Sequence, residues 1–369
     1  MPGPLVAIFH QPPRDGDPPL TRLLADARER LVAHQIGVFE SAGAARLVLV
    51  PGRPDGSAES FGERLARLVA EERFTGGVVV LGSGAVPLLR PADAARLVSA
   101  ATSGDRVALT NNRYSSDVCA ISDSGALRDL PPLPSDNALP RWLEERAGFT
   151  VAELPGRDRL AIDLDTPLDL ALLTLLRHTP GPVLELAAEH DLAVPRLAEL
   201  RSLAADPRRE LLVFGRSSSR TLRWLEGHVR CRVRFLAEER GLRAASPLAI
   251  AGDTSSAGRH ARPPASTLGL LLEERGPAAL AAVVGELSDG AILDTRVLMA
   301  GRFGADEDAW PSPEDRFASD LLRSDSVADP WLRTLTESAA GSASPIVLGA
   351  HTLVGPGIPL VLRRAVAAP

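Results

Sequence analysis

Short apolar runs alternate with segments of helical periodicity along the whole chain, and this alternation limits the folds that the chain can adopt. Residues 5–9, 46–50 and 77–81 have the length and apolar character of buried strands. Between them, apolar side chains recur at helical spacing over residues 20–41 and 61–72. The pattern therefore predicts an α/β fold with an open, mostly parallel sheet and helices on both faces.

The alternation is interrupted once, at residues 178–182, His-Thr-Pro-Gly-Pro. This break predicts a first domain of residues 1–180 and a second α/β domain of residues 181–369, which opens with a helical connector over about residues 183–205. We expect further strands at residues 106–110, 160–163, 210–214, 229–235, 291–299 and 345–348. Further helices are expected at residues 91–101, 137–147, 168–177, 221–226, 268–274, 278–287, 313–322 and 330–339, and in a last segment that ends near residue 366. Residues 252–264 predict a polar loop.

Composition excludes some environments and partners. With 369 residues, 45% of them apolar, the chain can bury the cores of two domains. No run of 18 apolar residues occurs and no positive charge precedes the apolar residues near the N-terminus, so we expect no membrane span, no signal peptide and a cytoplasmic location. Because the net charge is −6 and the aromatic content is 4%, nucleic acid is not an expected partner.

All 41 basic residues are arginine, and the absence of lysine excludes several kinds of chemistry. A Schiff base to pyridoxal phosphate, a Walker A loop and a protein-kinase phosphate site each require the ε-amine of lysine. Cys119 and Cys231 stand far apart, and the seven histidines show no metal-binding spacing with one another or with cysteine. We therefore expect neither pyridoxal phosphate nor a zinc site.

The segment of residues 161–170, Ala-Ile-Asp-Leu-Asp-Thr-Pro-Leu-Asp-Leu, places two carboxylates just before a helix start. If Asp163 and Asp165 end a strand, their side chains face the same way and could ligate a hard divalent cation that carries nucleotide phosphates. The same segment also has the pattern of a helix N-terminus, with Thr166 as the N-cap and Asp169 three residues later. A metal site and a helix cap are the two alternatives.

Three segments of the first 177 residues carry a resemblance to a known family. Residues 78–89 are Val-Val-Val-Leu-Gly-Ser-Gly-Ala-Val-Pro-Leu-Leu, and residues 106–121 contain Asn-Asn-Arg and Ser-Ser-Asp between two strand-like runs. Ser-Asp-Asn at residues 135–137 precedes the Asp163 segment, which matches Asp-x-Asp-Thr-Pro-x-Asp-Leu. In this order the segments resemble the nucleotidyltransferase superfamily with a glycosyltransferase-A-like fold, and within it the 2-phospholactate guanylyltransferases of coenzyme F420 synthesis and their molybdenum-cofactor relatives.

The resemblance implies a transferase that uses a nucleotide such as GTP and a small phosphorylated or carboxylated acceptor, with magnesium held by Asp163 and Asp165. Asp-x-Asp is also the metal signature of glycosyltransferases of this fold class. The nucleotide and the acceptor would lie near a set of residues that the resemblance implicates: Ser83, Gly84, Asn111, Asn112, Arg113, Ser116, Asp117 and Asp136.

The chain departs from the family's pattern at three points. The family's Gly-rich phosphate loop corresponds here to residues 10–16, where Pro12 and Pro13 supply no amide donors. No lysine is present, and the position of the family's first metal aspartate falls on Ala85 or Val86. Nucleotidyl transfer depends on positioning and on cationic stabilisation of phosphate charge. The alternative to an enzyme is therefore a catalytically degenerate scaffold or nucleotide sensor that acts through a protein partner or a second copy of the chain.

The second domain offers a weaker candidate site for an anion. Arg216, Ser217, Ser218, Ser219 and Arg220 lie between a strand and a helix, and His351 follows the last strand in an equivalent position. A serine-capped turn with solvated arginines is the alternative for this loop. Asp294 lies in an apolar run, where a charged residue either pairs with an arginine or belongs to a cleft, and we expect the pairing.

Overall fold

The computed structural model describes residues 3–51, 59–72, 76–176, 178–238, 265–304 and 306–363. The chain forms two compact units that interleave along the sequence. The first unit comprises Met1–Asp17, Leu24–Asp165 and His178–Leu186, and the second comprises Pro18–Leu23, Thr166–Arg177 and Ala187–Pro369. Each unit contains its own sheet, so the expected α/β class with a mostly parallel first sheet and a second α/β part is confirmed. In the described part of the chain, no helix has both the length and the apolar character needed to cross a membrane.

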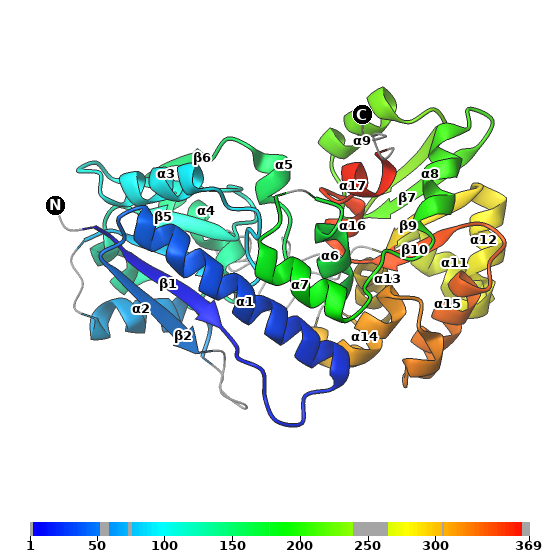
Figure 1. Ribbon diagram of the computed structural model, residues 1–369, viewed down its shortest axis with the longest axis horizontal. Coiled ribbons are helices and arrows are strands. Elements are labelled where there is room, and N and C mark those ends of the chain that lie inside the picture. Colours follow the sequence, from blue (N-terminus) through cyan, green and yellow to red (C-terminus); the bar gives the residue numbers. More distant parts are fainter. Residues whose placement is uncertain are drawn as a thin grey trace, which may run out of the picture. The chain divides into compact units, whose positions relative to one another are not determined.

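Six strands form the sheet of the first unit: β1 (Leu5–His10), β2 (Arg46–Pro51), β3 (Val78–Gly82), β4 (Val107–Thr110), β5 (Val118–Ile121) and β6 (Thr150–Glu153). Their order is β2-β1-β3-β5-β4-β6. Figure 1 shows β1 and β2 as neighbouring strands at one end of this order. β5 is antiparallel to both of its neighbours, whereas the other pairs are parallel. The start of β5 therefore lies at the same edge of the sheet as the carboxyl ends of β3 and β4.

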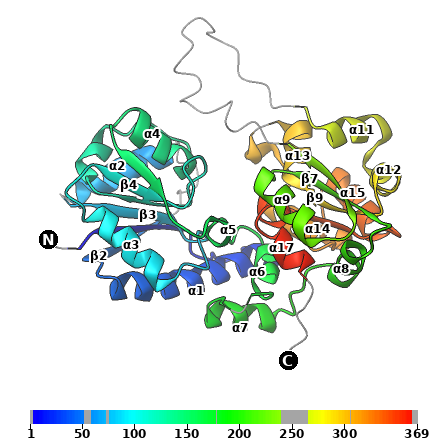
Figure 2. The ribbon, with the colours of Figure 1, turned by 90° about the horizontal axis from the view of Figure 1, so that it is seen from above.

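Helices cover both faces of this sheet. Figure 2 shows α1 (Pro19–Ser41) and α3 (Pro91–Ala101) on one face, and α2 (Phe61–Glu71) and α4 (Leu139–Glu145) on the other. The core of the α1 face contains Val6 and Ile8 of β1 together with Phe39 and Leu97 of the two helices. Side chains alternate along a strand, so every second residue of β1, including Val6 and Ile8, faces these helices. The turns η1 (Ser124–Asp129) and η2 (Asp136–Ala138) lie between β5 and α4 in the sequence.

The strand predicted at residues 160–163 is wrong. Leu160 ends the short helix α5 (Arg157–Leu160), and β6, which the sequence pattern did not reveal, takes the edge position beside β4. The backbone after α5 bonds to loops instead of to a strand: the Leu160 carbonyl accepts from the Asn111 side chain, and the Leu164 N–H donates to the Gly84 carbonyl. The following helix, α6 (Pro167–Leu173), is shorter than expected.

Four parallel strands form the sheet of the second unit: β7 (Glu210–Gly215), β8 (Arg232–Ala237), β9 (Gly290–Asp294) and β10 (Ile346–Gly349), in the order β10-β9-β7-β8. The chain leaves β7 for β8 on one side, and β9 then pairs with β7 on the other side. Such a reversal of strand order is a switch point, where open α/β sheets commonly place ligand sites.

The helices after α6 are α7 (Gly181–Glu189), α8 (Leu197–Ala205), α9 (Ser219–His228), α11 (Thr267–Arg275), α12 (Leu280–Leu287), α13 (Thr295–Phe303), α14 (Pro313–Asp320), α15 (Pro330–Ala340), α16 (His351–Val354) and α17 (Ile358–Leu362). The turns η3 (Pro277–Ala279), η4 (Glu307–Ala309) and η5 (Ser324–Ser326) lie among them. The predicted connector over residues 183–205 is thus two helices with a break between them.

Two strand predictions in this part need correction. The strand expected at residues 229–235 begins only at Arg232, and the run at residues 291–299 is a strand only as far as Asp294. There the Asp294 side chain accepts a hydrogen bond from the Arg296 N–H and so starts α13, which ends the strand. The polar loop predicted at residues 252–264 and the chain end beyond residue 363 lie outside the described residues.

Candidate functional site at the carboxyl edge of the first sheet

Sheet topology brings several of the predicted site residues to one edge. Ser83 and Gly84 follow β3, Asn111 follows β4 and Asp117 precedes the antiparallel β5. Leu81 pairs with Val118, and Thr110 pairs with Cys119, so the loops beyond these pairs are neighbours. The carboxyl edge of a sheet is where α/β folds of this kind bind ligands.

Gly84 allows the segment that contains Asp163 to approach the β3 loop. The Leu164 N–H donates to the Gly84 carbonyl at 2.9 Å. A Cβ atom at Gly84 would lie 2.6 Å from the Leu164 carbonyl oxygen, which is closer than real Cβ contacts. The glycine is therefore needed for packing of the two loops, whatever ligand the edge binds.

Arg28 of α1 fixes the same segment through two atoms. Its Nε donates to the Leu164 carbonyl at 2.8 Å, and its Nη2 lies 2.8 Å from Oδ1 of Asp165. The Asp165 side chain is 50% exposed, whereas Asp163 is 7% exposed. The two carboxylates thus differ in burial, and the strand that was expected to align them does not form.

Asp136 lies in η2 and interacts electrostatically with Asp165. Burial and the negative charge of Asp165 raise the pKa of Asp136 to about 7. We call Asp136, Asp163 and Asp165 the acidic edge. It offers carboxylate acceptors, one of which is partly protonated at neutral pH.

Asn111 shapes the loop between β4 and β5. Its Nδ2 donates to Oδ2 of Asp117 and to the Leu160 carbonyl, at 2.5 and 2.8 Å. Its Oδ1 accepts from the Asp117 N–H at 3.0 Å. The Ser116 hydroxyl, also buried, bonds to the Thr110 hydroxyl at 2.9 Å. These contacts give the predicted residues Asn111, Ser116 and Asp117 roles in holding the loop.

The residues at the tip of this loop differ in their hydrogen bonds, ion pairs and exposure. Arg113 forms an ion pair with Glu144 of α4, and its N–H donates to Glu153 at 2.9 Å. The Asn112 side chain accepts from the Tyr114 N–H at 3.1 Å. Tyr114 itself is 55% exposed. An exposed aromatic ring in a loop at the ligand edge can stack on a planar group.

Two observations bear on the magnesium site that the resemblance implies at Asp163 and Asp165. Magnesium requires oxygen ligands in near-octahedral geometry, commonly from one or two carboxylates together with phosphates and water. Oδ1 of Asp165 is already bonded to the Arg28 guanidinium, whose positive charge opposes a cation at the same oxygen. Among the described residues, no group of three or more His, Cys, Asp and Glu side chains could hold a metal ion.

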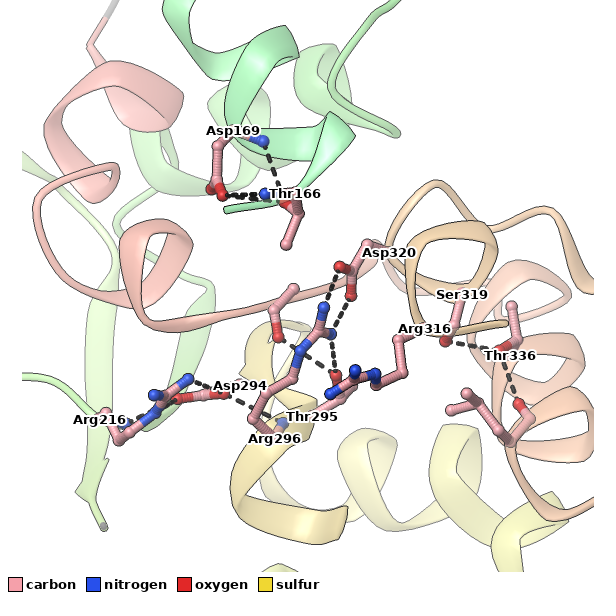
Figure 3. A network of polar contacts seen from close by, with 12 residues as sticks. Thr166, Asp169, Arg216, Asp294, Thr295, Arg296, Arg316, Ser319, Asp320 and Thr336 are labelled. Carbon is pink, nitrogen blue, oxygen red and sulfur yellow. Dashed lines mark hydrogen bonds and ion pairs between the residues drawn. The ribbon is translucent and has the colours of Figure 1, made fainter. Parts of the chain in front are cut away.

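In the second unit, the switch point between β7 and β9 holds buried charged residues (Figure 3). Arg216 makes a two-pronged ion pair with Asp294, with Nε to Oδ2 at 2.6 Å and Nη2 to Oδ1 at 3.1 Å. The expectation that Asp294 pairs with an arginine is confirmed. Burial by itself would raise the pKa of Asp294, but the Arg216 charge, its hydrogen bonds and Arg296 lower the pKa below its usual value. Gly215 has a φ of +121°, and a Cβ there would lie 2.2 Å from Cβ of Asp294.

The other residues of the predicted anion site also have structural contacts. The Ser217 hydroxyl donates to the Val354 carbonyl at 2.6 Å, and Ser218 caps α9 by accepting from the Thr221 N–H. Ser219 and Arg220 are exposed in the first turn of α9. His351 is partly buried at the start of α16. A phosphate at this loop stays a prediction.

Taken with the sheet topology, these contacts define an α/β protein with a polar carboxyl edge in each unit. No family model and no curated protein matches the sequence. One solved structure that resembles the chain is a protein of Desulfovibrio desulfuricans G20, provisionally named a nucleotide-diphospho-sugar transferase. The likeness covers 51% of this chain and 94% of that chain, with 17% sequence identity and a TM-score of 0.38.

Two residues of this site were missed from sequence. Arg28 lies within a long helix among other arginines, and nothing in its local pattern marks it as a partner of Asp165. Tyr114 is the one tyrosine of the chain and is flanked by implicated residues, so its position was an available signal.

Proposed function

We propose that the first unit is a nucleotide-binding scaffold that recognises the nucleoside part of its ligand at the carboxyl edge of the sheet. The ion pair between Arg28 and Asp165 carries this proposal, because it occupies the position where a transferase of this type would need its metal. The resemblance in sequence supports the nucleotide as the ligand class. The transfer of a nucleoside monophosphate from a nucleoside triphosphate to a small acceptor, with magnesium, is the competing proposal.

The charges at this edge favour the nucleoside over the phosphates. The acidic edge presents carboxylates, and the Asp165 carboxylate is half exposed. Carboxylates accept hydrogen bonds from ribose hydroxyls but repel phosphate. Tyr114 is exposed in the neighbouring loop and offers a ring on which a base can stack. We therefore place the ribose at the acidic edge, the base against Tyr114 and the phosphates towards solvent.

Two features argue against efficient phosphate transfer at this edge. In the loop after β1, Pro12 and Pro13 provide no N–H groups to cradle phosphate oxygens. The position of the family's first metal aspartate is occupied by Ala85 and Val86, which are both buried and have no ligand atoms in their side chains. The remaining carboxylates cannot offset the charge that develops on a transferring phosphoryl group.

The decisive experiment measures thermal stability with ATP, GTP, CTP and UTP, with the matching monophosphates and nucleosides, each with and without magnesium. We expect stabilisation by at least one base, with the monophosphate binding at least as well as the triphosphate and with no requirement for magnesium. Tyr114→Ala should weaken this binding about tenfold, because it removes the stacking ring. Tyr114→Phe, the matched control, should retain it.

Pyrophosphate release is measured in parallel with the four triphosphates, magnesium and phosphorylated or carboxylated acceptors. Magnesium-dependent release that is lost in the double variant Asp163→Ala, Asp165→Ala would overturn the scaffold in favour of the transferase. If no nucleotide or nucleoside stabilises the protein, the nucleotide itself is the wrong ligand class.

A further inference from the structure

β2 is an outer strand of the first sheet, and its free side is apolar. Among the described residues, β1 is the one strand that pairs with β2. The other side of β2 presents main-chain N–H and C=O groups to which no described strand bonds. β2 has six residues, with no charged side chain between Arg46 and Pro51. Leu49 is 48% exposed, although it is a large apolar side chain. An edge of this kind is a template for pairing with another strand.

The other outer strands of the two sheets have features that oppose such pairing. β6 has only 4 residues and ends with the exposed Glu153. β8 carries two exposed charges, on Arg232 and Arg234. All the residues of β10 are buried. Because short length, charge and coverage each protect a sheet edge from association, β2 is the least protected of these four described strands.

The hydrogen bonds beside β2 show which of its main-chain groups face outwards. The Ala45 N–H donates to the Pro4 carbonyl at 3.0 Å, so the main-chain groups of Ala45 point towards the strand β1. Successive residues of a strand direct their N–H and C=O groups to alternate sides. The residues of β2 whose main-chain groups point away from β1 are therefore Arg46, Val48 and Val50.

We propose that β2 pairs antiparallel with β2 of a second copy of this chain, about a two-fold axis that passes through Val48. In this register Val48 lies opposite Val48 of the second copy, and Arg46 lies opposite Val50. Each outward-facing residue then belongs to a pair that exchanges two main-chain hydrogen bonds. The inference does not depend on the nucleotide proposed for the acidic edge, because no residue of β2 belongs to that edge.

The side chains also fit this register. Leu47 packs against the core of the α1 face, and Leu49 lies on the same face of the sheet. Across the axis, Leu47 lies opposite Leu49 of the second copy, which covers the exposed leucine. Arg46 forms an ion pair with Glu72 of its own copy and lies opposite the apolar Val50, so like charges do not meet. Because both copies use the same surface, the assembly closes as a dimer.

The test measures the molar mass of the full-length protein by light scattering and sedimentation velocity, over concentrations from about 1 to about 100 µM. We expect a dimer with twice the 39.0 kDa mass of the chain. A monomer at every concentration would overturn the second copy as the occupant of this edge.

Two proline variants locate the interface. Val48→Pro removes an outward N–H but no hydrogen bond to β1, so it should weaken the dimer about tenfold or more without unfolding the sheet. Val151→Pro in β6 is the matched control: the Thr150 N–H donates to the Arg106 carbonyl, so the next N–H along the strand faces outwards. This control should leave the dimer intact. If Val48→Pro does not fold, Leu49→Lys places a charge in the interface and should weaken the dimer equally. A dimer that survives the folded variant unchanged refutes this edge.

Cross-linking determines the register. Leu47 and Leu49 of opposite copies would form a non-hydrogen-bonded pair with Cα atoms about 4.5 Å apart, which a disulfide can span. Under oxidising conditions a mixture of Leu47→Cys and Leu49→Cys proteins should therefore cross-link. Either variant alone should not, because its cysteines would lie about 7–8 Å apart across the axis. The native cysteines, Cys119 and Cys231, are buried and do not interfere. No cross-link in the mixture, or equal cross-linking of a single variant, would refute this pairing.

Discussion

The ion pair between Arg296 and Asp320 should be the most sensitive polar contact of the second unit. Nη1 and Nη2 of Arg296 lie 2.5 and 2.6 Å from the two carboxylate oxygens of Asp320 (Figure 3). The exposed fractions of the two side chains are 7% and 0%. Arg296 also donates to the Thr295 hydroxyl at 2.9 Å. Each charge is therefore hydrogen-bonded, and water does not replace a lost partner.

Arg296→Met removes the cation but keeps much of the side-chain volume. The buried Asp320 carboxylate then has no counter-charge from Arg296, and breaking a buried pair in this way costs about 3–5 kcal/mol. Replacing both partners, as in Arg296→Met with Asp320→Leu, should recover most of that loss, because no uncompensated charge stays buried. Arg209→Met is the control: in its ion pair with Asp289 the two side chains are 57% and 32% exposed, so its loss should cost less than about 1 kcal/mol.

The pH dependence gives a second criterion. Burial raises the pKa of Asp320, in spite of the opposing effect of Arg296. A carboxyl group whose folded-state pKa is raised favours folding when protonated, and this stability is lost as the pH rises through that pKa. Without Arg296 the pKa rises further, so the destabilisation caused by Arg296→Met should be smaller at pH 5 than at pH 8.

Urea unfolding followed by tryptophan fluorescence is a suitable assay, because three of the four tryptophans, Trp224, Trp310 and Trp331, lie in the second unit. Calorimetry on the same samples separates the transitions of the two units if they unfold independently. A loss below 1 kcal/mol for Arg296→Met at pH 8, or a double variant no more stable than the single one, would refute the assignment of this pair as a buried, mutually dependent unit.

Three further substitutions test two contacts of the first unit and the cap of α6. Gly84→Ala should lower the melting temperature by several degrees because its Cβ would meet the Leu164 carbonyl, whereas Gly82→Ala, with open space at its Cβ, should not; equal effects in calorimetry would contradict the close approach. Asp136→Asn should stabilise the protein at pH 8 and have little effect at pH 4, since a pKa raised to about 7 means that stability is lost as the pH rises through that value; urea titrations at both pH values decide this. Thr166→Ala should cost about 1 kcal/mol by removing the cap of α6, and a change within 0.3 kcal/mol in urea unfolding would exclude a stabilising cap.

Local sequence pattern was sufficient for most helices and for the strands with continuous apolar runs. The segment over residues 91–101 became α3 with the predicted bounds, because Pro91 favours a helix start and apolar positions recur along one face. β6 was missed because the strand, Thr-Val-Ala-Glu, has only 4 residues, most of which are exposed at the sheet edge. Such a strand is defined by its partner β4 and not by its own hydrophobicity.

The strand predicted over residues 291–299 failed for a different reason. Its side chains are buried throughout, so the pattern shows neither the two-residue period of a half-buried strand nor the 3.6-residue period of an amphipathic helix. A run whose side chains are all buried is equally compatible with a buried strand and a buried helix. Asp294 decides between them by capping α13, and its pairing with Arg216 depends on a residue 78 positions away in the sequence.

The candidate site was predictable as a set of loops but not as a set of free side chains. Strand order alone brings the loops after β3 and β4 together, and the family-like motifs lie in those loops. Whether a side chain is available to a ligand depends on distant partners, such as Glu144 for Arg113 and Arg28 for Asp165. Those partners lie on helices whose orientation is a tertiary property.

The Asp163 segment shows that a motif can be required by the local structure irrespective of any metal. Thr166 and Asp169 form a reciprocal capping box, in which the Thr166 side chain accepts from the Asp169 N–H while the Asp169 carboxylate accepts from the Thr166 N–H at 2.8 Å. Leu164 bonds through its backbone to Gly84 and Arg28. These contacts stabilise the local structure irrespective of any metal. Even without magnesium-dependent transfer, a chain would therefore require most of this motif in order to fold. The motif is thus evidence for the architecture, and it is not by itself evidence for the reaction.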